Sequence, residues 1–144
     1  MPHLSLPNRP LKLAIDFDGT IVEHRYPEIG RIRPFAFETL KSLQQKGHRL
    51  ILWTHRSGLR LEEAVEFCKK NGIRFYAVNK NYPEEKWDEN DSRKIDADLF
   101  IDDRMLCRLP SWGEIYQIIC PEDTADEVEE DDEEPIRKKS WRKK

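Results

Sequence analysis

Short apolar segments alternate with helix-like segments along most of this chain. Four apolar segments have the length of a strand, and they comprise residues 12–17, 49–53, 73–78 and 97–101. Strands separated by helices require crossover connections, which place them parallel in one sheet with helices on its faces. We therefore predict an α/β fold, specifically a Rossmann-like three-layer sandwich with a mainly parallel sheet.

Three segments carry the signals of helix starts and ends. The first, residues 34–47, has a proline in its first turn and a glycine at its end. The second, residues 61–72, repeats apolar residues at helical spacing and ends in Asn-Gly. The third, residues 111–121, opens with the spacing of a capping box and ends in proline. Each helix should pack its apolar face on the sheet.

The charge distribution separates a nearly neutral body from a highly charged C-terminal segment. Residues 122–134 hold ten carboxylates, and residues 136–144 hold six bases. Removing both segments from the chain totals of 28 acidic and 25 basic residues leaves 18 acids and 19 bases. Such a body gives no indication of nucleic-acid binding. The C-terminal segment has too few apolar residues to offset the entropy of ordering, so we predict that it is disordered.

A chain of 144 residues has room for one domain of ordinary size. We assign it to residues 11–121, between an N-terminal arm (1–10) and the charged tail (122–144). No apolar run approaches the length of a membrane span, and the N-terminus lacks the pattern of a secretory signal. A cytoplasmic protein without membrane contact is therefore expected.

Acidic and hydroxyl side chains follow three of the predicted strands. Asp16 and Asp18 come after the first strand, Thr54 after the second, and Asp102 and Asp103 after the fourth. The carboxyl ends of parallel strands lie at one edge of a sheet, where sites in such folds form. Carboxylates held close together repel one another unless a cation lies between them, and oxygen ligands suit magnesium. A Mg²⁺ ion is the predicted cofactor.

The same positions carry a family resemblance. The segment DFDGT at 16–20, Thr54, Lys94 and the segment IDD at 101–103 resemble, in order, the four signature motifs of the haloacid dehalogenase (HAD) superfamily of phosphotransfer enzymes. The resemblance extends over residues 11–120. It implies a Mg²⁺-dependent phosphatase that hydrolyses a phosphomonoester through an aspartyl phosphate.

The resemblance implies a role for each matching residue. Asp16 would be the nucleophile, and Asp18 the general acid that protonates the leaving oxygen and then the base that activates water. Thr54 would donate a hydrogen bond to the phosphoryl group, and Lys94 would steady its charge. Lys80 is the alternative to Lys94, because it follows the third strand directly, but the spacing of Lys94 before the fourth motif fits the family better.

The resemblance also implies a ligand set for the metal and positions for the substrate. Asp16 and Asp102 would bind Mg²⁺ through their side chains and Asp18 through its backbone carbonyl, with Asp103 assisting. Gly19 and Thr20 are expected at the substrate, where glycine allows the backbone to approach a phosphate closely. We expect Arg56 to contact the substrate as part of a basic cluster in the sequence that comprises His24, Arg25, Arg31, Arg33, His55, Arg56 and Arg60.

The spacing of the motifs leaves no room for a cap domain. The 33 residues between Thr20 and Thr54 are largely taken up by a helix, which leaves only residues 21–33 as a flap. The other available cover is the polar loop 79–93. The chain thus resembles the cap-less members of the superfamily, which accept large phosphorylated substrates or use a neighbouring subunit as a lid. A homo-oligomer is compatible with this arrangement.

Two other functions fit the same residues. A phosphate-binding or regulatory module would keep the site with little turnover, and a phosphotransferase would pass the phosphoryl group to an acceptor hydroxyl. The sequence leaves the identity of the substrate open.

Overall fold

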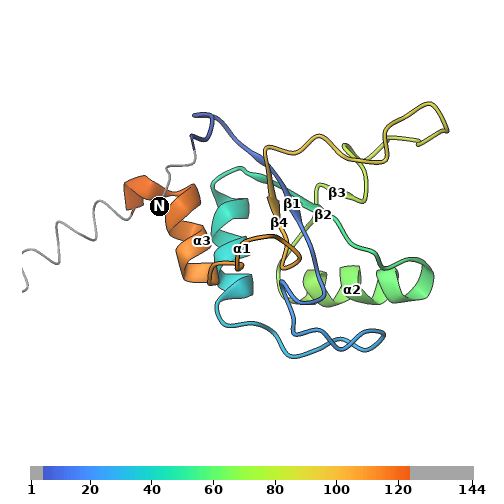
Figure 1. Cartoon of the computed structure of the whole chain (residues 1–144), viewed down its shortest axis with the longest axis horizontal. Helices are drawn as coiled ribbons and strands as arrows, with labels where there is room; N and C mark the ends of the chain where they lie inside the picture. The colour runs from blue at the N-terminus through green and yellow to red at the C-terminus, as the bar shows by residue number, and fades with distance from the viewer. Residues whose placement is uncertain (1–4, 124–144) are drawn as a thin grey trace, which may run out of the picture.

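The computed structural model describes residues 5–123 (Figure 1). Most of the charged C-terminal tail, whose disorder the sequence predicts, lies outside the described residues. In the described part of the chain, no helix combines the length and the apolar character that crossing a membrane requires.

Four parallel strands form one sheet in the order β3-β2-β1-β4. Their bounds are Lys12–Ile15 for β1, Arg49–Leu52 for β2, Ala77–Val78 for β3 and Leu99–Ile101 for β4. The predicted parallel sheet is confirmed, although its third strand is much shorter than the apolar run 73–78. Only the end of that run pairs with β2, in the register of Ile51 with Ala77 and Leu52 with Val78.

Three helices connect or follow the strands, with bounds Ala36–Gln45 for α1, Gly58–Lys70 for α2 and Trp112–Ile119 for α3. The predicted capping box of α3 is present, because the Ser111 hydroxyl accepts a hydrogen bond from the Glu114 N–H at 3.2 Å. Helix α1 begins later than predicted. Phe35 adopts a positive φ of 63° and serves as its N-cap, so Pro34 precedes the helix.

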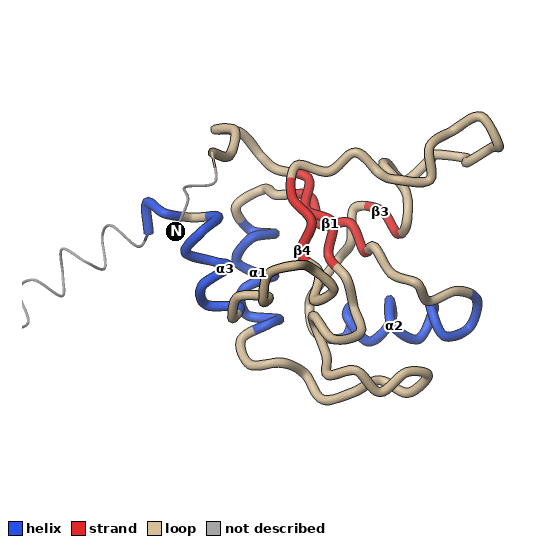
Figure 2. Tube along the Cα trace, in the orientation of Figure 1, coloured by secondary structure: helices blue, strands red, loops and turns tan. Residues whose placement is uncertain are grey.

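All three helices cover the same face of the sheet. The main core joins Leu13, Ile15, Leu50 and Leu52 of the strands to buried residues of α1, α2 and α3. The other face presents Ala14, Ile51 and Ala77, and its buried cover is Ile95 from the long segment between β3 and β4. Figure 2 shows this segment as a loop on the side of the sheet away from α1 and α3.

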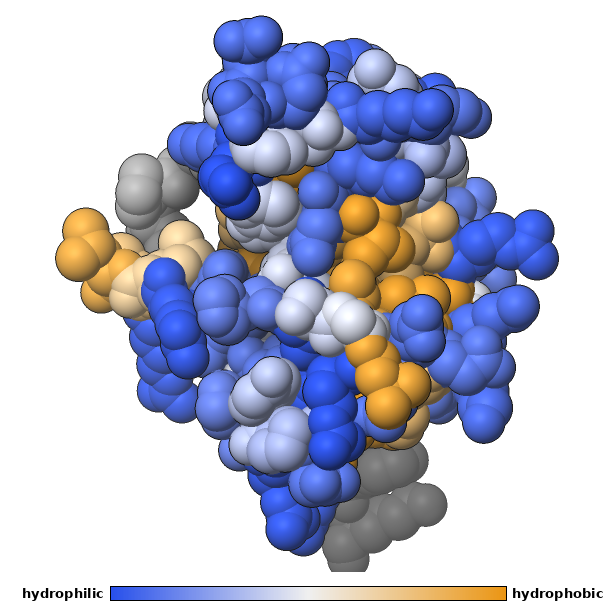
Figure 3. Space-filling model, turned by 90° about the vertical axis from the view of Figure 1, so that its right-hand side faces the viewer, coloured by the Kyte–Doolittle hydropathy of each residue, from blue (hydrophilic) through white to orange (hydrophobic). Residues whose placement is uncertain are grey.

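This arrangement corrects the predicted three-layer sandwich. The two helical connections β1-α1-β2 and β2-α2-β3 run in one direction across the sheet, and right-handed crossovers then place both helices on one face. The return from β3 to β4 runs in the opposite direction and crosses the second face. Because that return is an irregular segment, the fold has one helical layer, one sheet and a loop cover. Figure 3 views the molecule from the right-hand side of Figure 1, where hydrophobic surface lies beside hydrophilic side chains.

The strand order also determines where a site can form. From β1 the chain first moves outward through β2 and β3 and then returns to place β4 on the other side of β1. β1 therefore lies between β2 and β4, and the carboxyl ends of these three strands meet at one edge of the sheet. The acidic residues that follow β1 and β4 lie at this edge.

Candidate functional site

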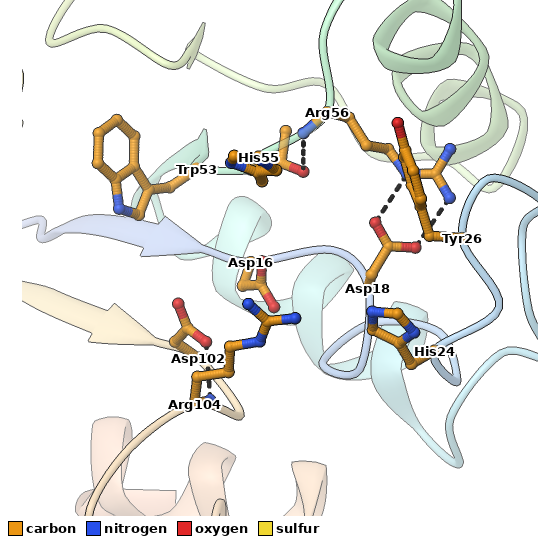
Figure 4. Close-up of a pocket in the computed structure, with 10 residues that line it drawn as sticks. Asp16, Asp18, His24, Tyr26, Trp53, His55, Arg56, Asp102 and Arg104 are labelled. Atoms are coloured by element: carbon orange, nitrogen blue, oxygen red, sulfur yellow. Dashed lines mark hydrogen bonds and ion pairs between the residues drawn. The ribbon is translucent and has the colours of Figure 1, made fainter.

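A pocket of about 570 Å³ lies at the carboxyl ends of β1, β2 and β4 (Figure 4). Its lining comes from the loops after these strands and from the flap. The lining residues are Asp16, Asp18, His24, Tyr26, Trp53, Thr54, His55, Arg56, Asp102 and Arg104. The predicted convergence of the first, second and fourth strands on one site is thus confirmed.

Backbone hydrogen bonds of the sheet bring the predicted acidic residues together. The Asp16 N–H donates to the Ile101 carbonyl at 2.9 Å, which sets Asp16 beside Asp102. Carboxylate oxygens of Asp16, Asp102 and Asp103 all lie within 4.8 Å of one another. The proposed ligand cluster therefore forms from residues more than 80 positions apart.

The electrostatics of this cluster favour a cation. Burial, together with the neighbouring carboxyl groups of Asp103 and Asp102, raises the pKa of Asp16 to about 8. A half-buried group of oxygen donors whose negative charges oppose one another is the kind of site that a hard divalent ion stabilises. The donor set thus fits Mg²⁺, with Asp16, Asp102 and Asp103 as candidate ligands.

The buried Thr20 holds two carboxyl groups of this cluster in place and does not face a substrate. Its side chain is fully buried, and its hydroxyl lies 3.0 Å from Asp16 Oδ2 and 3.2 Å from Asp103 Oδ1 as a donor. The same oxygen accepts the Asp103 N–H at 3.1 Å. The indole N–H of Trp112 holds the Thr20 carbonyl at 2.9 Å. The predicted substrate contact of Thr20 is therefore wrong, and the residue positions two carboxyl groups instead.

Position 19 needs a glycine because the Asp103 side chain packs against it, and not because a phosphate approaches it closely. Its φ is +89°, and a Cβ atom at this position would lie 2.3 Å from Asp103 Oδ2. Its N–H donates to the Val22 carbonyl at 2.7 Å, and its carbonyl accepts from Arg33 at 3.0 Å. Both polar groups of Gly19 are thus engaged within the protein, which differs from the predicted substrate-binding role.

Asp18 and Arg56 form a bidentate ion pair across the pocket (Figure 4). Both guanidinium-to-carboxylate distances are 2.8 Å. Arg56 is 2% exposed, so its side chain is not available as the predicted contact to a substrate. The structure pairs it with Asp18, a partner 38 residues earlier that no local sequence pattern indicates.

The backbone around Thr54 is held in a defined turn. Its N–H donates to the side chain of Asn79 at 2.8 Å, and its hydroxyl accepts the Arg56 N–H at 3.1 Å. Asn79 has a positive φ of 55°, a conformation that asparagine tolerates better than most residues. The sequence pattern gave Asn79 no role, yet this residue fixes the turn that presents Thr54 to the pocket.

Neither candidate lysine lines the pocket. The Lys94 ammonium lies 5.7 Å from the ring centroid of Phe100, on the loop-covered face of the sheet. Among the ion pairs of residues 5–123, none joins Lys94 or Lys80 to the aspartate cluster. The structure therefore does not bring Lys94 to the acidic residues, and the choice between the two lysines stays a prediction.

Two lining residues, Trp53 and Arg104, were not predicted from the sequence. Their positions in the sequence could have indicated both residues, since Trp53 directly precedes Thr54 and Arg104 directly follows the fourth motif. The Arg104 N–H donates to Asp102 Oδ1 at 2.9 Å, which orients this carboxyl group. Of the predicted basic cluster, His24 and His55 line the pocket as well.

Comparison with known proteins yields one informative match. No family model matches the chain, and no curated protein matches it. A solved structure described as a conserved protein coded by a locus of Bacteroides thetaiotaomicron is 57% identical, with a TM-score of 0.74. The match covers 79% of this chain and 93% of the other, so the two share one architecture over nearly the whole of the bacterial protein.

Proposed function

The chain belongs to the same protein family as this conserved protein of Bacteroides thetaiotaomicron, and we propose that it is a Mg²⁺-dependent phosphatase of the HAD type. The observation that carries the proposal is the meeting of Asp16, Asp102 and Asp103 at the carboxyl ends of β1 and β4. Asp18 lines the same pocket two residues after Asp16. Together these residues provide a nucleophile, an acid–base group and a set of cation ligands.

The side chains of Asp16 and Asp102 and the backbone carbonyl of Asp18 would hold the metal, with Asp103 assisting. When bound, Mg²⁺ supplies positive charge that lets an anionic phosphate approach these carboxylates. Thr20 keeps Asp16 and Asp103 in place through its buried hydroxyl. The ligand oxygens are therefore arranged before any substrate binds, which lowers the cost of reorganisation.

The reaction uses the residues in two steps. A carboxylate oxygen of Asp16 attacks phosphorus as the bond to the leaving oxygen breaks. Asp18, which has taken up a proton from solvent on one oxygen while the other still accepts from Arg56, gives this proton to the leaving oxygen. The product is an aspartyl phosphate on Asp16. Asp18 then takes a proton from water, whose oxygen attacks phosphorus, so that phosphate leaves and the Asp16 carboxylate is restored.

Four further residues would stabilise the phosphoryl group and the rest of the substrate. Thr54 accepts its hydrogen bond from Arg56, which leaves the proton of its hydroxyl for a phosphoryl oxygen. Lys94 would add positive charge after moving from its position over Phe100. Arg104 and His55 are exposed at the pocket and suit a second anionic group of the substrate. An open pocket of this kind fits a large phosphomonoester.

Hydrolysis of an aryl phosphate by the purified protein tests the proposal. Activity should require Mg²⁺, and Asp16→Asn should abolish it because an amide cannot form the acyl phosphate. Asp96→Asn is a matched control, since the Asp96 side chain is 95% exposed and lies outside the pocket. Turnover that survives Asp16→Asn or removal of divalent cations would contradict the mechanism.

The position of Lys94 favours a second candidate, a phosphate-binding or regulatory module with little turnover. With its ammonium over Phe100, Lys94 does not place its positive charge at the pocket, where it would steady a transferring phosphoryl group. Such a module should bind inorganic phosphate in the presence of Mg²⁺ and release none from esters. Calorimetric titration with phosphate, alongside the hydrolysis assay, separates the two candidates.

A further inference from the structure

Arg56 has a hydrogen-bond partner for each of its five side-chain N–H groups. Nε and Nη2 donate to the two oxygens of Asp18, each at 2.8 Å. Nη2 also donates to the Glu28 carbonyl at 2.9 Å, and Nη1 donates to the carbonyls of Pro27 and Arg60 at 3.2 Å. This set uses the full donor capacity of a guanidinium group.

The partners of Arg56 belong to three different parts of the protein. Asp18 lies in the loop after β1, and Arg60 in α2. Pro27 and Glu28 lie at the middle of the flap, residues 21–33. Arg56 thus ties the proposed acid–base residue, a helix and the flap to one buried group.

Aromatic rings add to this enclosure. The guanidinium carbon lies 5.1 Å from the ring centroid of Phe17 and 5.2 Å from that of Tyr26. Phe17 is a core residue between the two acidic residues of the first motif, and Tyr26 belongs to the flap. Both distances are within the range of cation–π attraction. The guanidinium group of Arg56 is therefore contacted by aromatic rings in addition to the hydrogen-bond acceptors at its edges.

The flap is anchored at its base as well as at its middle. The Glu23 N–H donates to the Arg31 carbonyl at 2.7 Å, and the Arg33 N–H donates to the Ile21 carbonyl at 2.9 Å. These bonds pair the two arms of the flap as in a hairpin. Because Arg56 also binds the middle of the flap, the flap is fixed at its base and at its middle.

We propose that Arg56 is a positioning residue that holds the Asp18 carboxyl group and the flap as one unit, so that the flap is a fixed wall of the pocket rather than a moving lid. The part concerning Asp18 rests on the proposed phosphatase function. A fixed wall keeps the pocket open throughout turnover, which is what a large ester requires. Arg56 also keeps the Asp18 carboxyl group in one orientation, through the oxygen that does not carry the proton, without the closure of a cap.

Lysine and methionine at position 56 test the two halves of this proposal. Arg56→Lys keeps the charge but cannot make the bidentate pair or reach three carbonyls at once. Arg56→Met removes the charge as well. Since Asp18 would then lose its buried partner, the double variant Arg56→Met with Asp18→Asn is included to keep a folded protein without an unpaired charge. Arg74→Met is the matched control, because the Arg74 side chain is exposed and lies outside the pocket and the flap.

Two readouts distinguish positioning from a merely structural role. For a small aryl phosphate, Arg56→Lys should lower kcat about 10- to 100-fold, a part of what general acid–base catalysis contributes, with little change in KM. Backbone amides of the flap should exchange with deuterium at least about tenfold faster in Arg56→Lys, in Arg56→Met and in the double variant, because the flap loses its anchor. Arg74→Met should change neither quantity.

The results that would overturn the proposal are specific. Unchanged kcat in a folded Arg56→Lys would show that Asp18 needs no positioning by Arg56. Unchanged flap exchange in all Arg56 variants would show that the flap does not depend on this residue. If the wild-type protein hydrolyses no ester, the phosphatase function fails, and flap exchange alone then decides whether Arg56 fixes the wall.

Discussion

Substitution of Gly19 by alanine tests the packing beneath the candidate metal site. The new Cβ would lie 2.3 Å from Asp103 Oδ2 and 2.7 Å from its Cγ, so the carboxyl group has to move. The positive φ of +89° adds backbone strain of about 1–2 kcal/mol. Moving Asp103 also breaks its hydrogen bonds with the buried Thr20, which costs roughly a further 1–3 kcal/mol.

Gly19→Ala should therefore lower the free energy of unfolding by roughly 2–5 kcal/mol, a large part of the stability of a typical domain. Denaturant unfolding at equilibrium measures this quantity. Gly47→Ala is the matched control, because Gly47 has nearly the same φ of +91° and a Cβ there would meet no atom within 4 Å. The control should lose only the backbone part, about 1–2 kcal/mol.

The same variant should weaken Mg²⁺ binding, since Asp103 leaves its place beside Asp16, whereas Gly47→Ala should bind Mg²⁺ like the wild type. The double variant Gly19→Ala with Asp103→Ala removes the clash. The losses of unfolding free energy caused by its two substitutions should therefore be non-additive. Equal destabilisation by Gly19→Ala and Gly47→Ala, with equal Mg²⁺ affinity, would refute the reasoning.

Three further predictions concern the cation, the lysine and acid stability. Mg²⁺ at about 100 times its dissociation constant should add about 2.7 kcal/mol to the free energy of unfolding, an effect that Asp102→Asn removes and Asp96→Asn keeps in thermal melts. Lys94→Met should lower kcat more than Lys80→Met, and the reverse order would assign the role to Lys80. The pKa of Asp98 is lowered to about 2 by hydrogen bonds from an arginine and a backbone amide, so its stabilising effect is present above pH about 4 and lost toward pH 2. Asp98→Asn should flatten that part of a stability profile measured by denaturant unfolding.

The aspartate cluster could be predicted from the sequence because each member follows a recognisable strand. Apolar runs of strand length end at Asp16 and Asp102, and parallel pairing brings the ends of neighbouring strands together. The sequence does not show that β1 and β4 are neighbours in the sheet, and the structure provides this information. The capping box at Ser111 was predictable for the same reason, since its partners lie three residues apart.

Features that depend on strand order or on distant partners could not be predicted. Helical periodicity shows that a helix has an apolar face but not which side of the sheet it covers, so the single helical layer was missed. The spacing that suggested a substrate contact for Arg56 carries no information about Asp18, its buried partner. Thr20 likewise looked available in the motif, and only packing against Trp112 shows that it is enclosed.

The central claim is that Asp16 forms a covalent phosphoryl intermediate, and chemical trapping tests it most directly. Borohydride reduces an acyl phosphate to an alcohol but leaves a free carboxylate intact. Protein mixed with an aryl phosphate and Mg²⁺, then reduced and digested, should show by mass spectrometry that Asp16 alone has been converted to the alcohol. Phosphate release without reduction at Asp16, or with reduction at another carboxyl group, would contradict the account.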